Sequence, residues 1–103
     1  MKKYDDWTFD QICVLVYHCD PMRPCKADYE PIARVIGRKW ARGGGGYAKL
    51  RNLQSVITGG RRGLSHGNVL DAVVMKFRAS DPKKFVRAAR KIEKRLSKLL
   101  ARS

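Results

Sequence analysis

Apolar residues recur at helical spacing in five segments of this chain, and prolines and glycines separate the segments. The first segment opens with TFDQ at residues 8–11, which is a capping box. Trp7 and Ile12 flank the box at the positions of a hydrophobic staple. The apolar residues that follow cover most of the helix circumference, so we predict a largely buried helix that ends by Asp20-Pro21.

Two shorter helices are predicted next. Asp28 is expected to be the N-cap of a short helix that stops at Gly37. Four consecutive glycines at residues 43–46 are expected to form a turn or a backbone close to a ligand, but they lack the Lys-Ser/Thr ending of a P-loop. A third helix is expected over residues 47–57 and is ended by Gly59. Its core stripe is Leu50, Leu53 and Ile57.

The last two helices carry long apolar stripes. A fourth helix is expected after an N-cap at Ser65 or Asn68, with inward residues Val69, Leu70, Val73, Val74 and Phe77. Asp81-Pro82 is expected to open a fifth helix, with the stripe Phe85, Ala88, Ala89, Ile92, Leu96, Leu99 and Leu100. We find no strand pattern. The prediction is an all-α single domain, 1–103, with a trihelical helix-turn-helix core over 7–58 and two C-terminal helices as an extension over 64–101.

Length and composition agree with one folded domain in the cell interior. The chain has 103 residues, of which 44% are hydrophobic and 31% are charged. The longest apolar run, residues 12–17, is far shorter than the roughly 20 residues of a membrane span. The first residues carry no apolar signal-peptide core. We therefore expect an intracellular protein, in cytoplasm or nucleoid, that does not enter a membrane.

Charge divides the chain into two unequal parts. Residues 1–33 hold four basic and six acidic side chains, a net −2, whereas residues 34–103 hold nineteen basic and three acidic ones, a net +16. Such an excess in seventy residues causes self-repulsion that solubility does not require, so a polyanionic partner is expected. Nucleic acid is the leading partner, ahead of an anionic membrane surface or an acidic protein.

The cysteines and histidines do not form a pattern typical of a catalytic or metal site. Cys13 and Cys19 fall in the predicted first helix, and His18 points away from Cys13 on a helical wheel. We interpret both cysteines as core residues in a reducing compartment and predict no metal and no cofactor. His66 is expected to be a turn residue. Without a nucleophile and base pair or a paired-carboxylate cluster, the sequence predicts no enzyme.

Two short motifs resemble a known class of DNA-binding module. The sequence IARVIGR at residues 32–38, followed by KLRNL at 49–53, is similar to the I-A-x-x-[IL]-G-R…K-L-x-N-[LF] pattern of small Myb-like or winged-helix-like modules, including those at the N-terminus of many bacterial and phage HNH-type endonuclease proteins. GLS at residues 63–65, with Asp71 and Phe77 before Asp81, resembles the helical extension of those modules. The resemblance implies DNA binding through the third helix, but no HNH segment is present, so it implies no cleavage.

The third helix also has base-reading residue types on its predicted outer face. A wheel centred on the core stripe puts Ala48, Arg51, Asn52 and Ser55 opposite the core, with Lys49 to one side. Basic residues bracket the helix at both ends: Arg38, Lys39, Arg42, Arg61 and Arg62. Trp40 either fills the gap between the second and third helices or stacks on a base. The leading interpretation is a non-catalytic protein that binds double-stranded DNA with this helix in the major groove, as a phage or mobile-element regulator would.

Two alternatives remain open. In the first, the protein binds DNA or RNA without sequence preference, through the basic face of the fifth helix and the Arg61-Arg62 turn. In the second, it is a small inhibitor or adaptor that binds an acidic partner protein or a nucleoprotein complex, with Val14 and Tyr17 as an exposed apolar patch.

Overall fold

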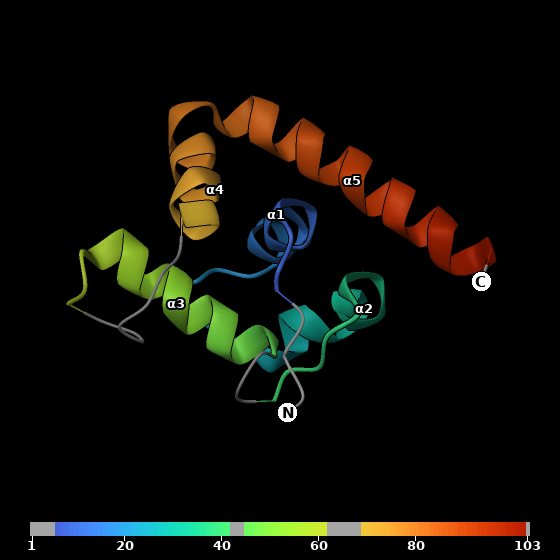
Figure 1. Cartoon of the computed structure of the whole chain (residues 1–103), viewed down its shortest axis with the longest axis horizontal. Helices are drawn as coiled ribbons and strands as arrows, with labels where there is room; N and C mark the ends of the chain where they lie inside the picture. The colour runs from blue at the N-terminus through green and yellow to red at the C-terminus, as the bar shows by residue number, and fades with distance from the viewer. Residues whose placement is uncertain (1–5, 42–44, 62–68, 103) are drawn as a thin grey trace.

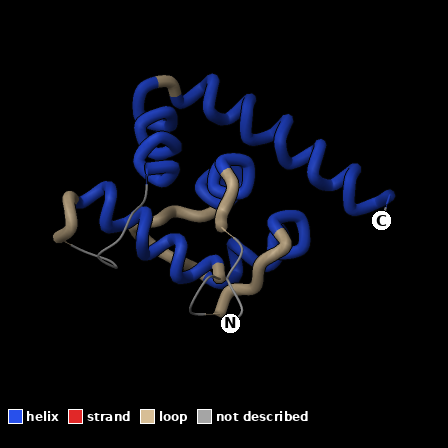
Figure 2. Tube along the Cα trace, in the orientation of Figure 1, coloured by secondary structure: helices blue, strands red, loops and turns tan. Residues whose placement is uncertain are grey.

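The computed structural model describes residues 6–41, 45–61 and 69–102. The regular elements in these ranges are all α-helices, which confirms the predicted all-α class (Figure 2). They are α1 (Phe9–His18), α2 (Lys26–Ile36), α3 (Gly46–Thr58), α4 (Val69–Ser80) and α5 (Pro82–Arg102). No helix in the described ranges is long and apolar enough to cross a lipid bilayer.

Helix α1 is the centre of the fold. It contacts α2, α4 and α5, and Figure 1 shows it end-on with α5 on one side and α3 on the other. Because several helices surround α1, five consecutive residues, Ile12 to Val16, are buried. Val14 is among them, so its predicted place in an exposed apolar patch was wrong, and Tyr17 is half-buried. A helical wheel drawn with one buried face underestimates the number of buried residues in a helix that neighbours cover on several sides.

The predicted signals at three helix ends are confirmed. The backbone N–H of Gln11 donates to Thr8 Oγ1 at 3.1 Å, and the backbone N–H of Thr8 donates to Gln11 Oε1 at 3.0 Å, which completes the capping box of α1. Gly37 ends α2 in the left-handed conformation, with φ of 78°. At the start of α5, the backbone N–H of Lys84 donates to Asp81 Oδ1 at 3.1 Å.

Helix α2 begins three residues earlier than an N-cap at Asp28 predicts. Its N-cap is Cys25, and Asp28 lies inside the first turn, so the prediction that Asp28 is the N-cap was wrong. A carboxylate interacts favourably with the positive end of a helix both at the N-cap and in the first turn. The residue type alone therefore did not show which of these two positions Asp28 occupies. The proposed caps of the fourth helix, Ser65 and Asn68, lie outside the described residues.

Helix α3 begins inside the glycine run, at Gly46, and α2 comes very close to it there. A Cβ atom on Gly46 would lie 2.6 Å from Cε1 of Tyr29, closer than two carbon atoms can approach. Beside this contact Trp40 packs between Tyr29 and Tyr47, with both pairs of ring centroids 5.4 Å apart. Trp40 is partly buried against the core, which confirms the packing alternative for this residue.

Helix α4 turns a different face inward from the one predicted. Asp71 and Val74 are its fully buried residues, whereas Val69 is 80% exposed, Val73 is 47% exposed and Leu70 is also exposed. The predicted inward positions of these three residues were wrong because the apolar residues of α4 surround the helix, and its contacts with α3 and α5 decide the buried face. In α5, Phe85, Ala89 and Ile92 are buried as predicted, but Leu99 is exposed.

Candidate nucleic-acid interface

Helix α5 presents a continuous basic surface on the side away from the core. At 100° per residue, six basic residues fall within a wedge about 100° wide, opposite the buried stripe of α5. All six are exposed: Lys83, Arg87, Arg90, Lys91, Lys94 and Lys98. We call this set the α5 basic strip. From residue 83 to residue 98 it extends over about 22 Å at 1.5 Å per residue.

Two other charged groups of α5, Glu93 and Arg95, attach it to α1. Glu93 forms an ion pair with His18, and the guanidinium of Arg95 donates to the carboxylate of Asp10. Among the residues that the structure describes, no ion pair involves a member of the α5 basic strip. The edge of α5 toward α1 therefore has paired charges, whereas the outward strip keeps its charges available to a partner.

The residues predicted on the outer face of α3 are much less accessible than those of α5. Ala48, Arg51 and Asn52 are half-buried, and Ser55 is buried. The predicted outward position of Ser55 was wrong because α3 packs against both α2 and α4, so more of its circumference is covered than a wheel with one core face allows.

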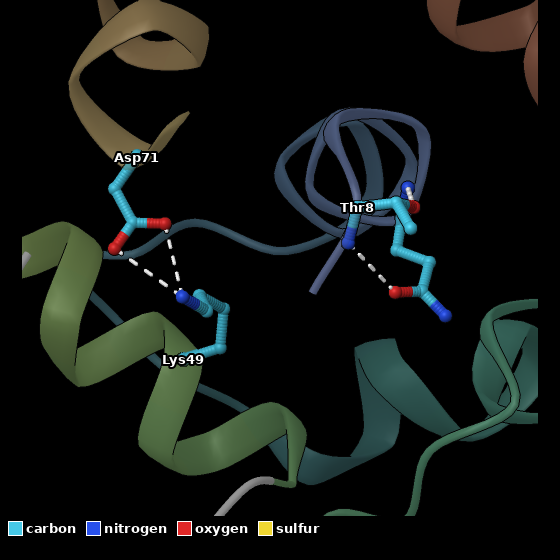
Figure 3. A network of polar contacts seen from close by, with 4 residues as sticks. Thr8, Lys49 and Asp71 are labelled. Carbon is cyan, nitrogen blue, oxygen red and sulfur yellow. Dashed lines mark hydrogen bonds and ion pairs between the residues drawn. The ribbon is translucent and has the colours of Figure 1, made fainter. Parts of the chain in front are cut away.

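Lys49 also lies in the interior, against its predicted place beside the outer face. Its Nζ atom lies 3.0 Å from Oδ1 and 3.3 Å from Oδ2 of Asp71, so the ammonium donates to both carboxylate oxygens (Figure 3). The same ammonium lies 5.8 Å from the centre of the Trp7 ring. Lys49 is thus part of a buried ion pair between α3 and α4, and it is not available to DNA.

The partner of Lys49 was missed by the sequence-based prediction. Asp71 is the one acidic residue between positions 34 and 80, and it interrupts an apolar stretch. An isolated acid in such a place is a signal of a buried ion pair, because a carboxylate enters a protein interior only with a cation or several donors.

The basic residues that flank α3 fall into two groups. Lys39 and Arg61 are exposed, and Arg38 is half-buried with its guanidinium carbon 4.6 Å from the centre of the Trp7 ring. Arg42 and Arg62 lie outside the described residues.

The two candidate surfaces lie on different sides of the molecule. In Figure 1, α5 runs along the top, α3 lies at the bottom, and α1 is between them. A straight duplex against the α5 basic strip is therefore separated from α3 by the central helix.

The two buried cysteines, Cys13 and Cys19, are structural. Burial raises the pKa of the Cys13 thiol from 9.0 to about 12, with a smaller contribution from the negative charge of Asp10. The pKa of Cys19 is also raised to about 12, mainly by burial. Both thiols stay protonated at neutral pH, and a protonated thiol is a poor nucleophile and metal ligand. Within the described ranges, no three His, Cys, Asp or Glu residues lie together as a metal site would require.

Comparisons with protein-family models, with curated proteins and with solved structures find no match to this chain, so the function has to be argued from its own residues.

Proposed function

We propose that this protein binds double-stranded DNA through the α5 basic strip, by contacts to phosphates that do not depend on base sequence. The observation that carries the proposal is the presence of six exposed cations on one face of one helix, with no ion-pair partner among the described residues. Duplex DNA carries one negative charge per about 1.7 Å with both strands counted, so a 22 Å length of duplex carries about 13 phosphate charges, of which the strip faces those on one side. A DNA duplex therefore complements the α5 basic strip in the sign of its charge and in the length over which that charge extends.

The shape of α5 favours DNA over duplex RNA. A helix with its side chains is about 10–12 Å across, and the major groove of B-DNA is about 12 Å wide. The major groove of A-form RNA is deep and too narrow for side chains to read. Since α5 is the outermost helix along one side of the molecule in Figure 1, its outward face is able to approach a B-form groove.

This proposal differs from recognition by the third helix. A helix that reads bases needs exposed side chains, whereas Lys49 and Ser55 are buried and Arg51 is half-buried. The Myb-like resemblance and the helix-turn-helix role of α3 therefore stay predictions, and the proposed phosphate contacts are assigned to α5. The role is binding, without catalysis.

The first test is the salt dependence of binding to a labelled duplex, measured by fluorescence anisotropy. Six phosphate contacts give a slope of log affinity against log salt of about −5. Neutralising four strip residues to Gln is expected to reduce that slope by about 4 units in magnitude. The variant is Lys83→Gln, Arg87→Gln, Arg90→Gln and Lys94→Gln.

A matched control removes the same number of exposed charges elsewhere. Its changes are Arg23→Gln, Arg34→Gln, Lys39→Gln and Arg61→Gln. We expect this control to keep most of the slope, because none of its residues lies on α5. Equal losses in the two variants would show that net charge alone attracts DNA, and a slope near zero in the unmodified protein would overturn the proposal.

The second test distinguishes α5 from α3 and DNA from RNA. A selection from random duplexes is expected to return no motif, and Arg51→Ala and Asn52→Ala are expected to leave affinity unchanged. A motif that disappears in either variant would instead assign base reading to α3, since a bidentate contact is worth about 1–3 kcal/mol. Tighter binding to duplex RNA of the same sequence would overturn the choice of DNA.

A further inference from the structure

A groove of about 700 Å³ lies on the side of the molecule formed by α3 and α4. Its apolar lining comes from four parts of the chain: the loop after α1, the end of α3, α4 and the start of α5. These residues are Met22, Val56, Ile57, Ala72, Met75 and Ala79, with Pro82 at the start of α5. We call this cavity the α3–α4 groove.

Within the described ranges, apolar surface stays exposed at the groove. Ile57 is 42% exposed although it lies on the core stripe of α3, and Val73 is exposed beside the groove on α4. Clustered apolar surface of this kind typically marks a binding site, whereas single exposed apolar residues are ordinary. Met22 and Met75 add flexible, polarizable side chains, which adapt to the shape of a bound apolar surface.

The charges around the groove indicate which kind of partner fits it. Lys76 and Arg78 line it, and Asp20 is the acid in its lining. The whole chain carries a net charge of +14. An occupant with apolar and acidic side chains gains from both features, because its apolar residues are removed from water and its carboxylates meet two cations.

The C-terminal end of α5 from a second copy of this chain fits the groove poorly. Near the C-terminal end of α5 the exposed apolar residue is Leu99. The cations Lys98 and Arg102 lie close to it on the same helix. Those cations would meet Lys76 and Arg78 in the groove, and like charges across an interface are unfavourable.

We infer that the α3–α4 groove docks an amphipathic helix of a partner protein, with its apolar face in the groove and its acidic residues paired with Lys76 and Arg78. A helix that lays its apolar face into a groove is a common mode of peptide recognition. The groove is built mainly by α3 and α4, and the α5 basic strip faces outward from α5, so this inference does not depend on the proposed DNA binding. Together the two surfaces let the protein join a partner protein to a duplex.

The probe for this inference is a labelled peptide of about 15 residues, a length at which an isolated helix is marginally stable. It carries leucines at positions i, i+3, i+4 and i+7 of each repeat and glutamates at most other positions. A control peptide has the same composition with the leucines dispersed around the helix. We expect the amphipathic peptide to bind about tenfold more tightly by anisotropy, which corresponds to burial of about one leucine.

Matched variants separate the groove from the general positive charge. Ile57→Asp is expected to weaken binding about tenfold and Lys76→Glu about threefold, whereas the controls Leu99→Asp and Lys84→Glu leave it within about twofold. Circular dichroism checks that each variant keeps its helix content. All four positions are exposed, so the fold is expected to tolerate the changes.

Two results would overturn the inference. If the dispersed peptide binds as well as the amphipathic one, or Lys84→Glu acts like Lys76→Glu, the attraction comes from net charge alone. If sedimentation shows a dimer that Ile57→Asp abolishes, the groove belongs to a second copy of the chain. Loss of DNA binding in the strip variant, with peptide binding intact, distinguishes the two sites.

Discussion

The buried ion pair between α3 and α4 gives the strongest prediction about stability. Asp71→Asn is expected to destabilise the protein because it replaces the carboxylate that faces the buried ammonium of Lys49. The Asp71 side chain is 0% exposed and the Lys49 side chain 6%, so water does not compensate for the change. Breaking a pair of this kind costs about 3–5 kcal/mol. That is a large part of the 5–15 kcal/mol typical of a whole domain.

The double variant separates the strength of the pair from the cost of a buried charge. Lys49→Met is expected to be as harmful as Asp71→Asn, because it leaves Asp71 without the ammonium. Lys49→Met combined with Asp71→Leu fills the site with apolar side chains, and we expect it to be neutral or more stable by about 1–4 kcal/mol. The effects of the single changes should therefore be strongly non-additive.

Urea unfolding measures these free energies. Far-ultraviolet circular dichroism follows the helices, and tryptophan fluorescence reports on the site itself, because the Trp7 ring centre is 5.8 Å from Lys49 Nζ. The slope of the unfolding free energy against urea concentration, the m-value, must be equal among the variants for their free energies to be compared. If either single substitution lowers the free energy of unfolding by less than about 1 kcal/mol, the pair contributes no more than an exposed ion pair does, and the prediction is wrong.

Three further predictions concern the cysteines, alkaline pH and the glycine run. At about pH 8, alkylation detected by mass spectrometry should modify exposed Cys25 and spare buried Cys13 and Cys19 until the chain unfolds; equal labelling of all three would contradict this. Burial raises the pKa of Tyr29 from 10.0 to about 12, as it does for the two buried thiols, so folding favours the protonated forms. These groups should then leave the free energy of unfolding unchanged below about pH 9 and lower it as the pH rises toward about 12. A thermal melting temperature that stays constant across this pH range would disprove the prediction. Gly46→Ala should lower the free energy of unfolding by about 1–3 kcal/mol in urea, because the added Cβ would meet Tyr29. This loss is expected although alanine favours helices more than glycine does. An unchanged urea midpoint would count against the close approach of the two helices.

Three of the helix ends could be predicted because their causes are local. The capping box of α1 needs residues three positions apart, and Asp81 at the start of α5 acts on a backbone N–H three residues later. Gly37 ends α2 because it adopts the left-handed conformation more easily than other residues. The basic character of α5 was also evident, since nearly all its charged residues have one sign.

The placement of the α3 residues could not be predicted in the same way. Lys49 and Ser55 have the polar side chains of an exposed face, yet both are buried. Their burial depends on α4, whose Asp71 lies 22 positions beyond Lys49 in the chain. A helical wheel contains the period of one helix and no information about how many neighbours cover it.

From the residues alone it follows that the chain is helical, that α1, α2 and α5 have the end signals at Thr8, Gly37 and Asp81, and that positive charge is concentrated after residue 33. These properties follow from spacing, caps and residue type, which act over a few residues. The packing of the helices was needed to show which face of α4 is buried, that Lys49 pairs with Asp71, and that α3 and α5 lie on opposite sides of α1. The reason is that burial of a side chain is a property of all the helices around it, and those helices come together only when the whole chain folds.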